Sequence, residues 1–375
     1  MEKQQEKNKI IIDIGSEFVK AGFSGEEKPE FFFQSKIGKI ETNSIMDELN
    51  SKKFFKNNLI ENKEENIIWE NVVERGHVIN WDNWEQMISY IFYSEFKVDP
   101  LEYPVLVPET MLGTRNFREK SSQILFETFN VPKMSIMIQS VLSLISYQKT
   151  TGFVIEIGGG VTYAVPIYEN YVLPHAVLRL DIAGYDLTRN LRDILIKDGK
   201  IESNEITFEE ARNIKEKFCY VSFDPQEDLQ ALNQPNSFSR DITLDNGRTF
   251  SIDQQRFLSV EPLFDPSLIG MNSVGLSHLC SNSILKCDQE IQKDLFKNIV
   301  LAGGSSVLDG VETRLIKDLT FLHSDQEIKI FSNPQRDFSC WIGGSIFCSL
   351  PNTDFYWATE EEYQESGPSL LMRKI

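Results

Sequence analysis

Short apolar runs alternate with amphipathic segments of helical period along most of the chain. Apolar runs of this length predict buried strands, and apolar side chains at three- and four-residue spacing predict helices. The clearest segments are residues 101–112 as a strand, 118–130 as a helix, 134–147 as a strand followed by a helix, 204–221 as a helix capped by Thr207, and 297–319 as a strand, a glycine turn and a helix. This alternation predicts an α/β fold.

Two stretches repeat one pattern in separate halves of the chain. IIIDIGSEFVKAGF (10–23) and FVIEIGGGVTYAVPIY (153–168) each run from an apolar strand through an acid, Ile and Gly into a second strand. The pattern predicts a β-hairpin in each half, as a weak internal repeat. Taken singly, each is adequately explained as an ordinary hairpin turn with an incidental acid. The occurrence of a pair favours a functional interpretation.

The tips of these hairpins suit a nucleotide. Glycines there permit positive φ and let backbone N–H groups approach an anion. Asp13 and Glu156 cannot bind phosphate, but carboxylates hold hydrated Mg²⁺ beside phosphates. Two facing hairpins therefore predict a cleft that clamps a nucleoside triphosphate.

A third segment, LAGGSSV (301–307), supports this hypothesis. It follows an apolar strand and opens a helix, so Gly303 and Gly304 would let a ligand pack against the backbone. Ser305 or Ser306 is predicted to cap the helix. A Gly-Gly turn is weak evidence by itself, because many such loops contain one.

Length and composition limit the class of protein. With 375 residues, the chain is too long for one ordinary core, so two domains are expected. Charged residues at 25% and hydrophobic residues at 41% are typical of a globular protein, and no apolar run reaches the roughly 18 residues of a membrane span. The formal net charge of −18 opposes direct nucleic-acid binding. No membrane partner is predicted.

Cysteine and histidine usage predicts no metal centre of its own. The five cysteines form no CxxC pair and are interpreted as reduced, buried thiols of an intracellular protein. The four histidines lack metal-ligand spacing, so a zinc site is not predicted. Residues 41–72 are rich in Asn, Lys and Glu, and are predicted to form an exposed, mobile excursion.

The three nucleotide-type motifs, in this order, resemble the phosphate and adenosine motifs of the superfamily of actins, heat-shock chaperones and sugar kinases. The chain is most similar to the actin family, over nearly its whole length. The most specific stretches are REKSSQILFETFNVP (118–132), GVTYAVPIYENYVLPHAVLRLDIAGYDLTRNL (160–191), FSCWIGGSIFCSL (338–350) and EEYQESGPSLLMRKI (361–375).

The resemblance implies ATP or ADP with Mg²⁺ as cofactors. Ser16 would hydrogen-bond the terminal phosphate, Lys20 would neutralise the β-phosphate, and Gln139 would position the attacking water. Asp13 and Glu156 would orient water around the metal and, with Gln139, form the catalytic set. The nucleotide-binding residues implied are Asp13, Gly15, Ser16, Glu17, Lys20, Glu156, Gly158, Gly159, Gly160, Gly184, Arg212, Lys215, Glu216, Gly303, Gly304 and Ser305. From the residues alone, Arg212, Lys215 and Glu216 would be assigned to a solvated helix face.

Several positions depart from the family pattern. Glu17 stands where actins have glycine, and Glu156 and Gly159 stand where they have aspartate. Tyr163 replaces a histidine near the attacking water, and tyrosine, with an ordinary pKa of about 10, accepts a proton poorly at neutral pH. Asp337 replaces a basic residue near the adenine. The hypothesis is a nucleotide bound mainly as a structural link, hydrolysed slowly or not at all.

The resemblance implies a two-domain architecture. Each domain would hold a mixed five-stranded sheet flanked by helices, with the nucleotide cleft between them. The outer domain would comprise residues 1–146 and 339–375, with a small mobile subdomain at about 35–71, and the inner domain residues 147–338.

Two classes of function remain open. The first is a cytoskeletal subunit that forms filaments, and the apolar loop at 263–275 and the C-terminal tail favour it. The second is a non-polymerising subunit of a larger chromatin-remodelling, dynein-linked or ciliary axonemal complex, which the altered phosphate loops and the charged segment 41–55 favour. The expected partners are other actin-family subunits or such an assembly. The expected location is the cytoplasm and cytoskeleton, with the nucleus or cilium as alternatives. A small-molecule kinase is disfavoured because no second substrate pocket is evident.

Overall fold

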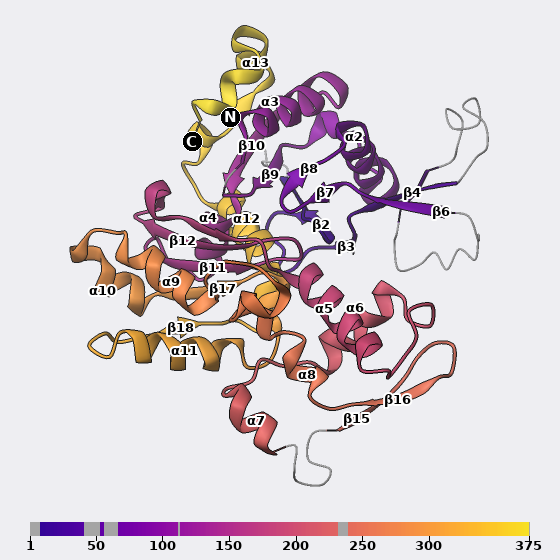
Figure 1. Cartoon of the computed structure of the whole chain (residues 1–375). Helices are drawn as coiled ribbons and strands as arrows, with labels where there is room; N and C mark the ends of the chain where they lie inside the picture. Colours follow the sequence, from indigo (N-terminus) through magenta and orange to yellow (C-terminus); the bar gives the residue numbers. More distant parts are fainter. Residues whose placement is uncertain (1–7, 41–52, 56–66, 112, 232–238, 375) are drawn as a thin grey trace. The chain divides into compact units, whose positions relative to one another are not determined.

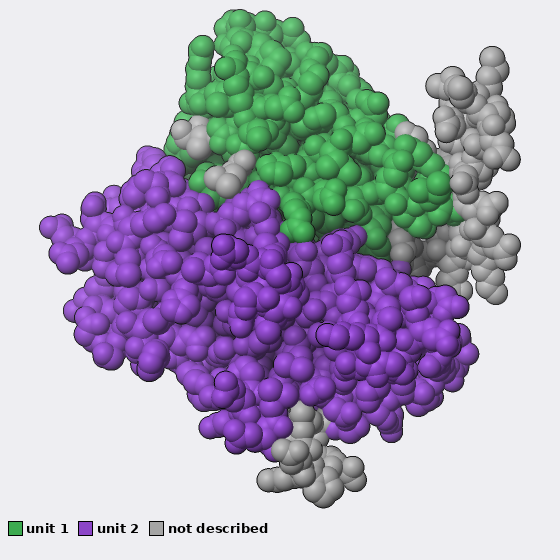
Figure 2. Space-filling model, in the orientation of Figure 1, with its two compact units in different colours: residues 1–149, 338–375 green, residues 150–337 purple. Residues whose placement is uncertain are grey.

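The chain forms two compact units. The computed structural model describes residues 8–40, 53–55, 67–111, 113–231 and 239–374. Unit 1 comprises residues 1–149 and 338–375, and unit 2 comprises residues 150–337 (Figure 2). The segments 41–52 and 56–66, which hold most of the predicted mobile excursion, lie outside the described residues. No helix among those residues is both long enough and apolar enough to span a membrane.

Unit 1 is built on a sheet of six described strands (Figure 1). In spatial order they are β19 (Ala358–Thr359), β10 (Lys133–Ile138), β9 (Val105–Glu109), β1 (Ile10–Ile14), β2 (Phe18–Phe23) and β3 (Phe31–Gln34). Strands β1, β9 and β10 are parallel, and β1–β2–β3 form antiparallel hairpins. The expected five strands are present, and the two-residue β19 adds a sixth beside β10. Ile10, Ile11 and Ile12 are fully buried, as expected for a central strand covered on both faces.

Helices of unit 1 follow strands or loops, and some of them begin at a side-chain cap. They are α2 (Trp81–Tyr90), α3 (Arg115–Gln123), α4 (Gln139–Ser146), α12 (Ser339–Ser349) and α13 (Glu360–Ser366). Thr114 caps α3 by accepting a hydrogen bond from the Phe117 N–H. The predicted helix at 118–130 continues from α3 as a π-helix at Ile124–Thr128, and α2 continues similarly at Ile91–Phe96. Smaller sheets pair β4 (Lys36–Ile40) with β5 (Lys53–Phe55) and β6 (Ile67–Asn71), and β7 (Val73–Glu74) with β8 (His77–Val78).

The packing of α12 on α4 depends on a glycine. A Cβ atom at Gly343 would lie 1.7 Å from the carbonyl oxygen of Leu142 in α4. Any larger residue would force the two helices apart, because real contacts are never that short. The Gly-Gly pair of the 338–350 stretch therefore has a structural reason, which is close approach of two helix backbones.

Unit 2 repeats the strand arrangement of unit 1. Its main sheet has the order β13 (Tyr171–Val172), β12 (Thr162–Tyr168), β11 (Gly152–Ile157), β17 (Ile299–Ala302) and β18 (Ile330–Phe331), and β14 (Leu178–Leu180) also pairs with β12. Strands β11, β17 and β18 are parallel, and β11–β12–β13 form antiparallel hairpins. Both hairpins of the predicted repeat are therefore confirmed, each at the same place in its sheet.

Most helices of unit 2 contribute side chains to one apolar core. The helices of this unit are α5 (Gly184–Lys197), α6 (Phe208–Phe218), α7 (Pro225–Ala231), α8 (Gln255–Leu258), α9 (Leu276–Leu285), α10 (Gln289–Lys297) and α11 (Val311–Leu322), and a separate ribbon joins β15 (Arg240–Thr243) to β16 (Thr249–Ile252). The predicted cap of α6 is confirmed: Thr207 and Glu210 form a reciprocal capping box.

The predicted serine cap after the Gly-Gly turn is wrong. Residues 304–307 form a 3₁₀ turn, and α11 begins only after Gly310, which has a φ of 86° and provides no side-chain cap. The Ser305 hydroxyl instead donates to the Gly158 carbonyl at 2.8 Å, and the Ser306 hydroxyl donates to the Gly303 carbonyl at 2.6 Å. Both serines stabilise the turn rather than the helix.

His323 gives unit 2 a pH-dependent contact. Its Nε2 lies 2.7 Å from the Ser281 hydroxyl, and its ring packs against Phe296 with centroids 4.7 Å apart. Burial lowers the pKa of His323 below the ordinary value of 6.5, while Asp325 opposes that shift. The unfolded chain then binds the proton first as the pH falls, so the stability contributed by neutral His323 is lost below pH 6.5.

We therefore expect the thermal midpoint of the protein to fall as the pH is lowered from 7.5 toward 5. A His323→Gln variant should be less stable at pH 7.5 but show a shallower fall, measured by differential scanning calorimetry. His278→Gln is the matched control and should keep the original slope. Equal slopes in the His323 and control variants would contradict this role.

Candidate functional site

The predicted site residues divide between the two units, and within each unit several of them lie at the carboxyl ends of parallel strands. In unit 1 these are the ends of β1, β9 and β10, and in unit 2 the ends of β11 and β17. In open α/β sheets, ligands bind outside the carboxyl ends of the strands, where loops leave free backbone N–H groups. The candidate residues thus lie where such a fold places a binding site.

The half-site of unit 1 is centred on Asp13. Asp13 lies on β1 directly opposite Lys20 on β2, and the residue is only 3% exposed. Lys20 Nζ lies 3.6 Å from Asp13 Oδ2, and Gln139 Nε2 donates to Asp13 Oδ1 at 3.0 Å. A buried carboxylate is stabilised by an opposite charge and by a donated hydrogen bond. The fold therefore brings together three predicted residues from distant parts of the sequence.

Hydrogen bonds fix the backbone and the serine hydroxyl of the turn after β1. The Gly15 N–H donates to the Phe18 carbonyl at 3.0 Å, which closes the hairpin. The Ser16 hydroxyl accepts a hydrogen bond from the Gly76 N–H at 3.0 Å. The half-buried Glu17 is fixed through its backbone, because its carbonyl accepts from the Ser35 N–H at 2.9 Å. Gly76, in the β7–β8 turn, is a contact that sequence reasoning missed, and no local pattern signals it.

The half-site of unit 2 has an equivalent turn. The Gly158 N–H donates to the Val161 carbonyl at 3.1 Å, as Gly15 does to Phe18 in unit 1. The Gly158 carbonyl accepts from the Gly184 N–H at 3.1 Å, and the Gly159 carbonyl accepts from the Tyr185 N–H at 2.7 Å. The second loop is therefore fastened to the start of α5, and Gly160 lies buried beside it.

Glu156 lies on β11 directly opposite Tyr163 on β12. Tyr163 is 2% exposed, and Arg179 on β14 donates to its hydroxyl at 3.4 Å. Arg179 also pairs with Asp181 at 2.7 Å. Tyr163 is thus held in place by the sheet, one strand away from a candidate metal-orienting carboxylate.

The helix-face interpretation of α6 is wrong for two of its three residues. Lys215 is 3% exposed, and its Nζ donates to the Gly184 carbonyl and the Thr188 hydroxyl, both at 2.9 Å. The Arg212 side chain is 11% exposed and lies 3.8 Å from Glu216, which is exposed. Lys215 therefore supports the start of α5, next to the second phosphate-type loop. Thr188 was missed because only the long-range contact reveals its role.

The donors present suit Mg²⁺, which prefers carboxylate oxygens and retained waters. Asp13 and Glu156 each supply a carboxylate at the base of a glycine turn. Among the residues that the structure describes, no group of three metal-ligating side chains is preassembled.

The two glycines of the Gly-Gly turn differ in the space available for a side chain. Gly303 has a φ of 90°, and a Cβ atom there would lie 2.4 Å from the Ile157 carbonyl oxygen. A Cβ atom at Gly304 would have no atom within 4 Å. Replacing Gly303 by alanine should therefore cost about 2 kcal/mol of unfolding free energy, because the strain and the clash cannot be relieved cheaply.

Gly304→Ala is the matched variant for this turn. We expect its stability to change by less than about 0.5 kcal/mol, because the added methyl group meets open space. Urea unfolding of both variants measures the difference. Equal stabilities would contradict the geometry of the turn.

A family model described as Actin matches residues 4–375. The match covers nearly all of the chain, including both hairpins and the Gly-Gly turn.

Proposed function

Because the chain belongs to the actin family, we propose that it is a cytoskeletal assembly subunit that binds ATP or ADP with Mg²⁺ and hydrolyses ATP slowly or not at all. Actin-family proteins generally bind a nucleotide and a divalent cation, and associate with other subunits of the family. The observation that carries the proposal is the duplicated hairpin, which ends in a glycine turn and has an acid at its base in each unit. The nucleotide would engage both hairpins, as the family resemblance implies.

The buried contacts of unit 1 support phosphate binding. Lys20 and Gln139 both converge on Asp13, so protein contacts alone hold the side chains at the base of this hairpin turn. The hydroxyl of Ser16 already accepts the Gly76 N–H. The same hydroxyl could donate its hydrogen to a phosphate oxygen while it keeps accepting from Gly76, without moving the backbone. Preorganisation of this kind lowers the entropic cost of binding.

The surroundings of Glu156 support slow turnover. Proton acceptance by a positioned base contributes about 10²- to 10⁴-fold to rates in general. At this position the chain supplies Tyr163, whose hydroxyl accepts a hydrogen bond from Arg179. Gly159 supplies no carboxylate to the outer shell of a metal. Both features remove groups that would assist attack by water.

A gain-of-function variant tests this account of turnover. Tyr163→His combined with Gly159→Asp should raise single-turnover ATP hydrolysis about tenfold, since it supplies a base and an outer-shell acid. The matched control is Tyr163→Phe, which removes the hydroxyl and should leave the rate unchanged. A large loss of hydrolysis in Tyr163→Phe would show that the tyrosine is catalytic and would contradict the proposal.

The second candidate is a non-polymerising subunit fixed in a larger complex of the chromatin-remodelling, dynein-linked or ciliary axonemal kind. The altered loop residues Glu17 and Gly159 favour it. The predicted outer contact segment, 41–55, lies mostly outside the described residues. High-speed pelleting in Mg-ATP and salt, over a concentration series, separates the two. A critical concentration supports the filament subunit, and protein that stays soluble throughout supports the fixed subunit.

A further inference from the structure

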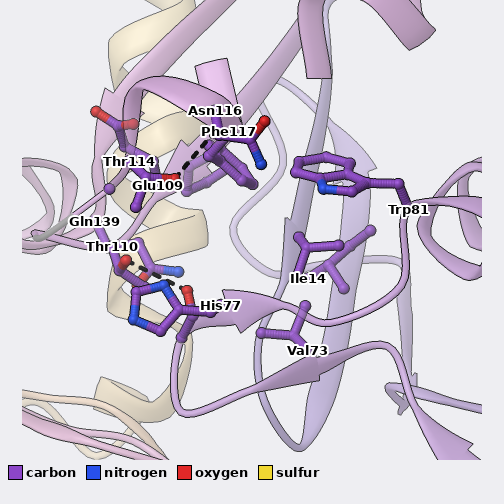
Figure 3. Close-up of a pocket in the computed structure, with 14 residues that line it drawn as sticks. Ile14, Val73, His77, Trp81, Glu109, Thr110, Thr114, Asn116, Phe117 and Gln139 are labelled. Atoms are coloured by element: carbon purple, nitrogen blue, oxygen red, sulfur yellow. Dashed lines mark hydrogen bonds between the residues drawn. The ribbon is translucent and has the colours of Figure 1, made fainter. Parts of the chain in front are cut away.

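A pocket opens in unit 1 beside the half-site just described (Figure 3). It lies among the β7–β8 turn, the first residue of α2, and the loop that joins β9 to α3. Its cavity volume is about 60 Å³, and the pocket is partly open to solvent, so a ligand would be only partly enclosed.

One side of the pocket is apolar. Ile14, Val73 and Trp81 lie together on this side in Figure 3, and Phe117 adds a second aromatic ring to the lining. The Trp81 and Phe117 rings have centroids 6.0 Å apart. A flat apolar body could therefore contact two aromatic rings and two branched side chains.

The opposite side offers hydrogen-bonding groups. His77, Thr110 and Gln139 lie on this side in Figure 3. The Thr110 hydroxyl donates to the Gly76 carbonyl at 3.4 Å, a long bond that a better acceptor could displace. These groups lie at the end of the pocket away from Trp81, so they would orient the polar end of a ligand.

The carboxylate in the pocket lining is already paired with an arginine. Glu109 is the one carboxylate among the lining residues that the structure describes. Arg118 Nε lies 3.0 Å from both oxygens of that carboxylate, and this buried pair leaves little attraction for a cation. The occupant that fits is therefore uncharged.

We propose that this pocket binds a small uncharged molecule with one aromatic ring system and one amide or hydroxyl group. The ring lies against Trp81 and Phe117, and the polar group faces Thr110 and His77. This site differs from the nucleotide half-site, although Gln139 belongs to both. Aromatic ligands between apolar walls gain affinity mainly from buried area, with the polar group fixing the orientation.

Occupancy of the pocket would act on the phosphate-type turn. Gly76 lines the pocket and donates its N–H to Ser16, and Gln139 lines it and donates to Asp13. A ligand pressed against these residues changes the partners of two groups at the hairpin tip. This coupling rests on the proposed nucleotide binding, whereas ligand binding itself does not.

The test uses the full chain and indole-3-carboxamide as the probe. Binding is followed by protein-detected NMR up to about 10 mM probe, since a ligand of this size binds in the micromolar to millimolar range. Val78→Phe places a ring in the pocket and should weaken binding about tenfold or more. Ile79→Phe, at the neighbouring, 53% exposed position, is the matched control and should bind normally.

Each outcome decides the proposal. Saturable binding that Val78→Phe abolishes and Ile79→Phe preserves supports the site. Absence of binding to the wild type would show that water alone fills the pocket, and equal binding by both variants would place the probe elsewhere. Either result overturns the proposal.

The coupling is measured separately. The affinity for a fluorescent ATP analogue should change about fivefold or more at saturating probe, the lower end of typical coupling between sites. An unchanged affinity with proven probe binding would overturn the coupling alone. If no nucleotide binds at all, the proposed function fails while the NMR result still stands.

Discussion

Replacing Lys20 by methionine is expected to weaken the binding of Mg-ATP about 100-fold, because a charge-assisted contact to phosphate is worth about 1.5–3 kcal/mol. Lys20 is the cation that the hairpin holds against Asp13, at 3.6 Å. Methionine keeps the length and apolar stem of the side chain but removes its charge. The substitution also removes the positive charge beside the carboxylate of Asp13, which is only 3% exposed. A modest loss of stability should therefore accompany the loss of affinity.

Fluorescence titration with an ATP analogue measures the affinity, and calorimetry measures stability in parallel. Lys329→Met is the matched control, because Lys329 is 56% exposed and pairs only with Glu327 among the ion pairs of the described residues. It should bind like the wild type. If Lys20→Met loses stability but keeps its affinity, Lys20 serves only to neutralise Asp13.

Replacing Arg314 by leucine is expected to destabilise unit 2 by about 3–5 kcal/mol, because it leaves a buried acid without its partner. Arg314 Nη2 lies 3.0 Å from Glu261 and its Nε lies 3.1 Å from Asp318. It also donates to the Ser222 carbonyl at 2.9 Å and lies over the Phe264 ring. One side chain thus joins α11, the segment after α6 and the start of the 263–275 loop.

Burial raises the pKa of Glu261, and Arg314 opposes that shift. Without Arg314, nothing from this side chain opposes the effect of burial on the pKa of Glu261. Glu261 should therefore take up a proton more readily in the folded variant. The stability of Arg314→Leu should therefore fall as the pH rises from about 4.5 through the raised pKa of Glu261. The wild type should show less of this fall. Calorimetry of the wild type and the variant across pH 4.5 to 8 measures the difference. Near neutrality, the thermal midpoint of the variant should be roughly 10 °C lower.

Two further variants test this interpretation of Arg314. Arg115→Leu removes a 71%-exposed partner of Glu119 and should change stability by less than about 1 kcal/mol. Glu261→Leu with Arg314→Leu should lose less than the sum of the two single variants, because the unpaired charge is removed. Simple additivity would show that the pair does not interact.

Local signals predicted the hairpins well. The order acid, Ile, Gly within apolar runs specifies a strand, a tight turn and a returning strand, and these depend on neighbouring residues alone. The capping box of Thr207 and Glu210 is equally local, and it is present. The α/β class followed from the same local alternation of patterns.

Long-range contacts were not predictable from such patterns. Ser305 satisfies a cap pattern, yet its hydroxyl donates to Gly158 in the other part of the sheet. Lys215 has the spacing of a solvated residue, yet it is buried against Gly184. The π-helices after α2 and α3 could not be predicted either, since one extra residue per turn leaves no clear mark in the apolar spacing. For Ser305 and Lys215, a partner far away in the sequence decides where the side chain lies.

The resemblance supplied what the patterns could not. It grouped Asp13, Lys20 and Gln139, and the fold joins these three side chains through Asp13. The assignment of each residue to a step of nucleotide binding or hydrolysis stays a prediction. The binding experiments above test those assignments one residue at a time.

The central claim is a bound nucleotide that turns over slowly. A single-turnover experiment with γ-labelled ATP tests it most directly: the protein is loaded in Mg²⁺, free nucleotide is removed, and bound ATP and released phosphate are followed over hours. We predict that labelled ATP stays with the protein and that phosphate appears far more slowly than in an actin control run in parallel. Failure to retain any nucleotide, or phosphate release at the rate of the actin control, would contradict the account.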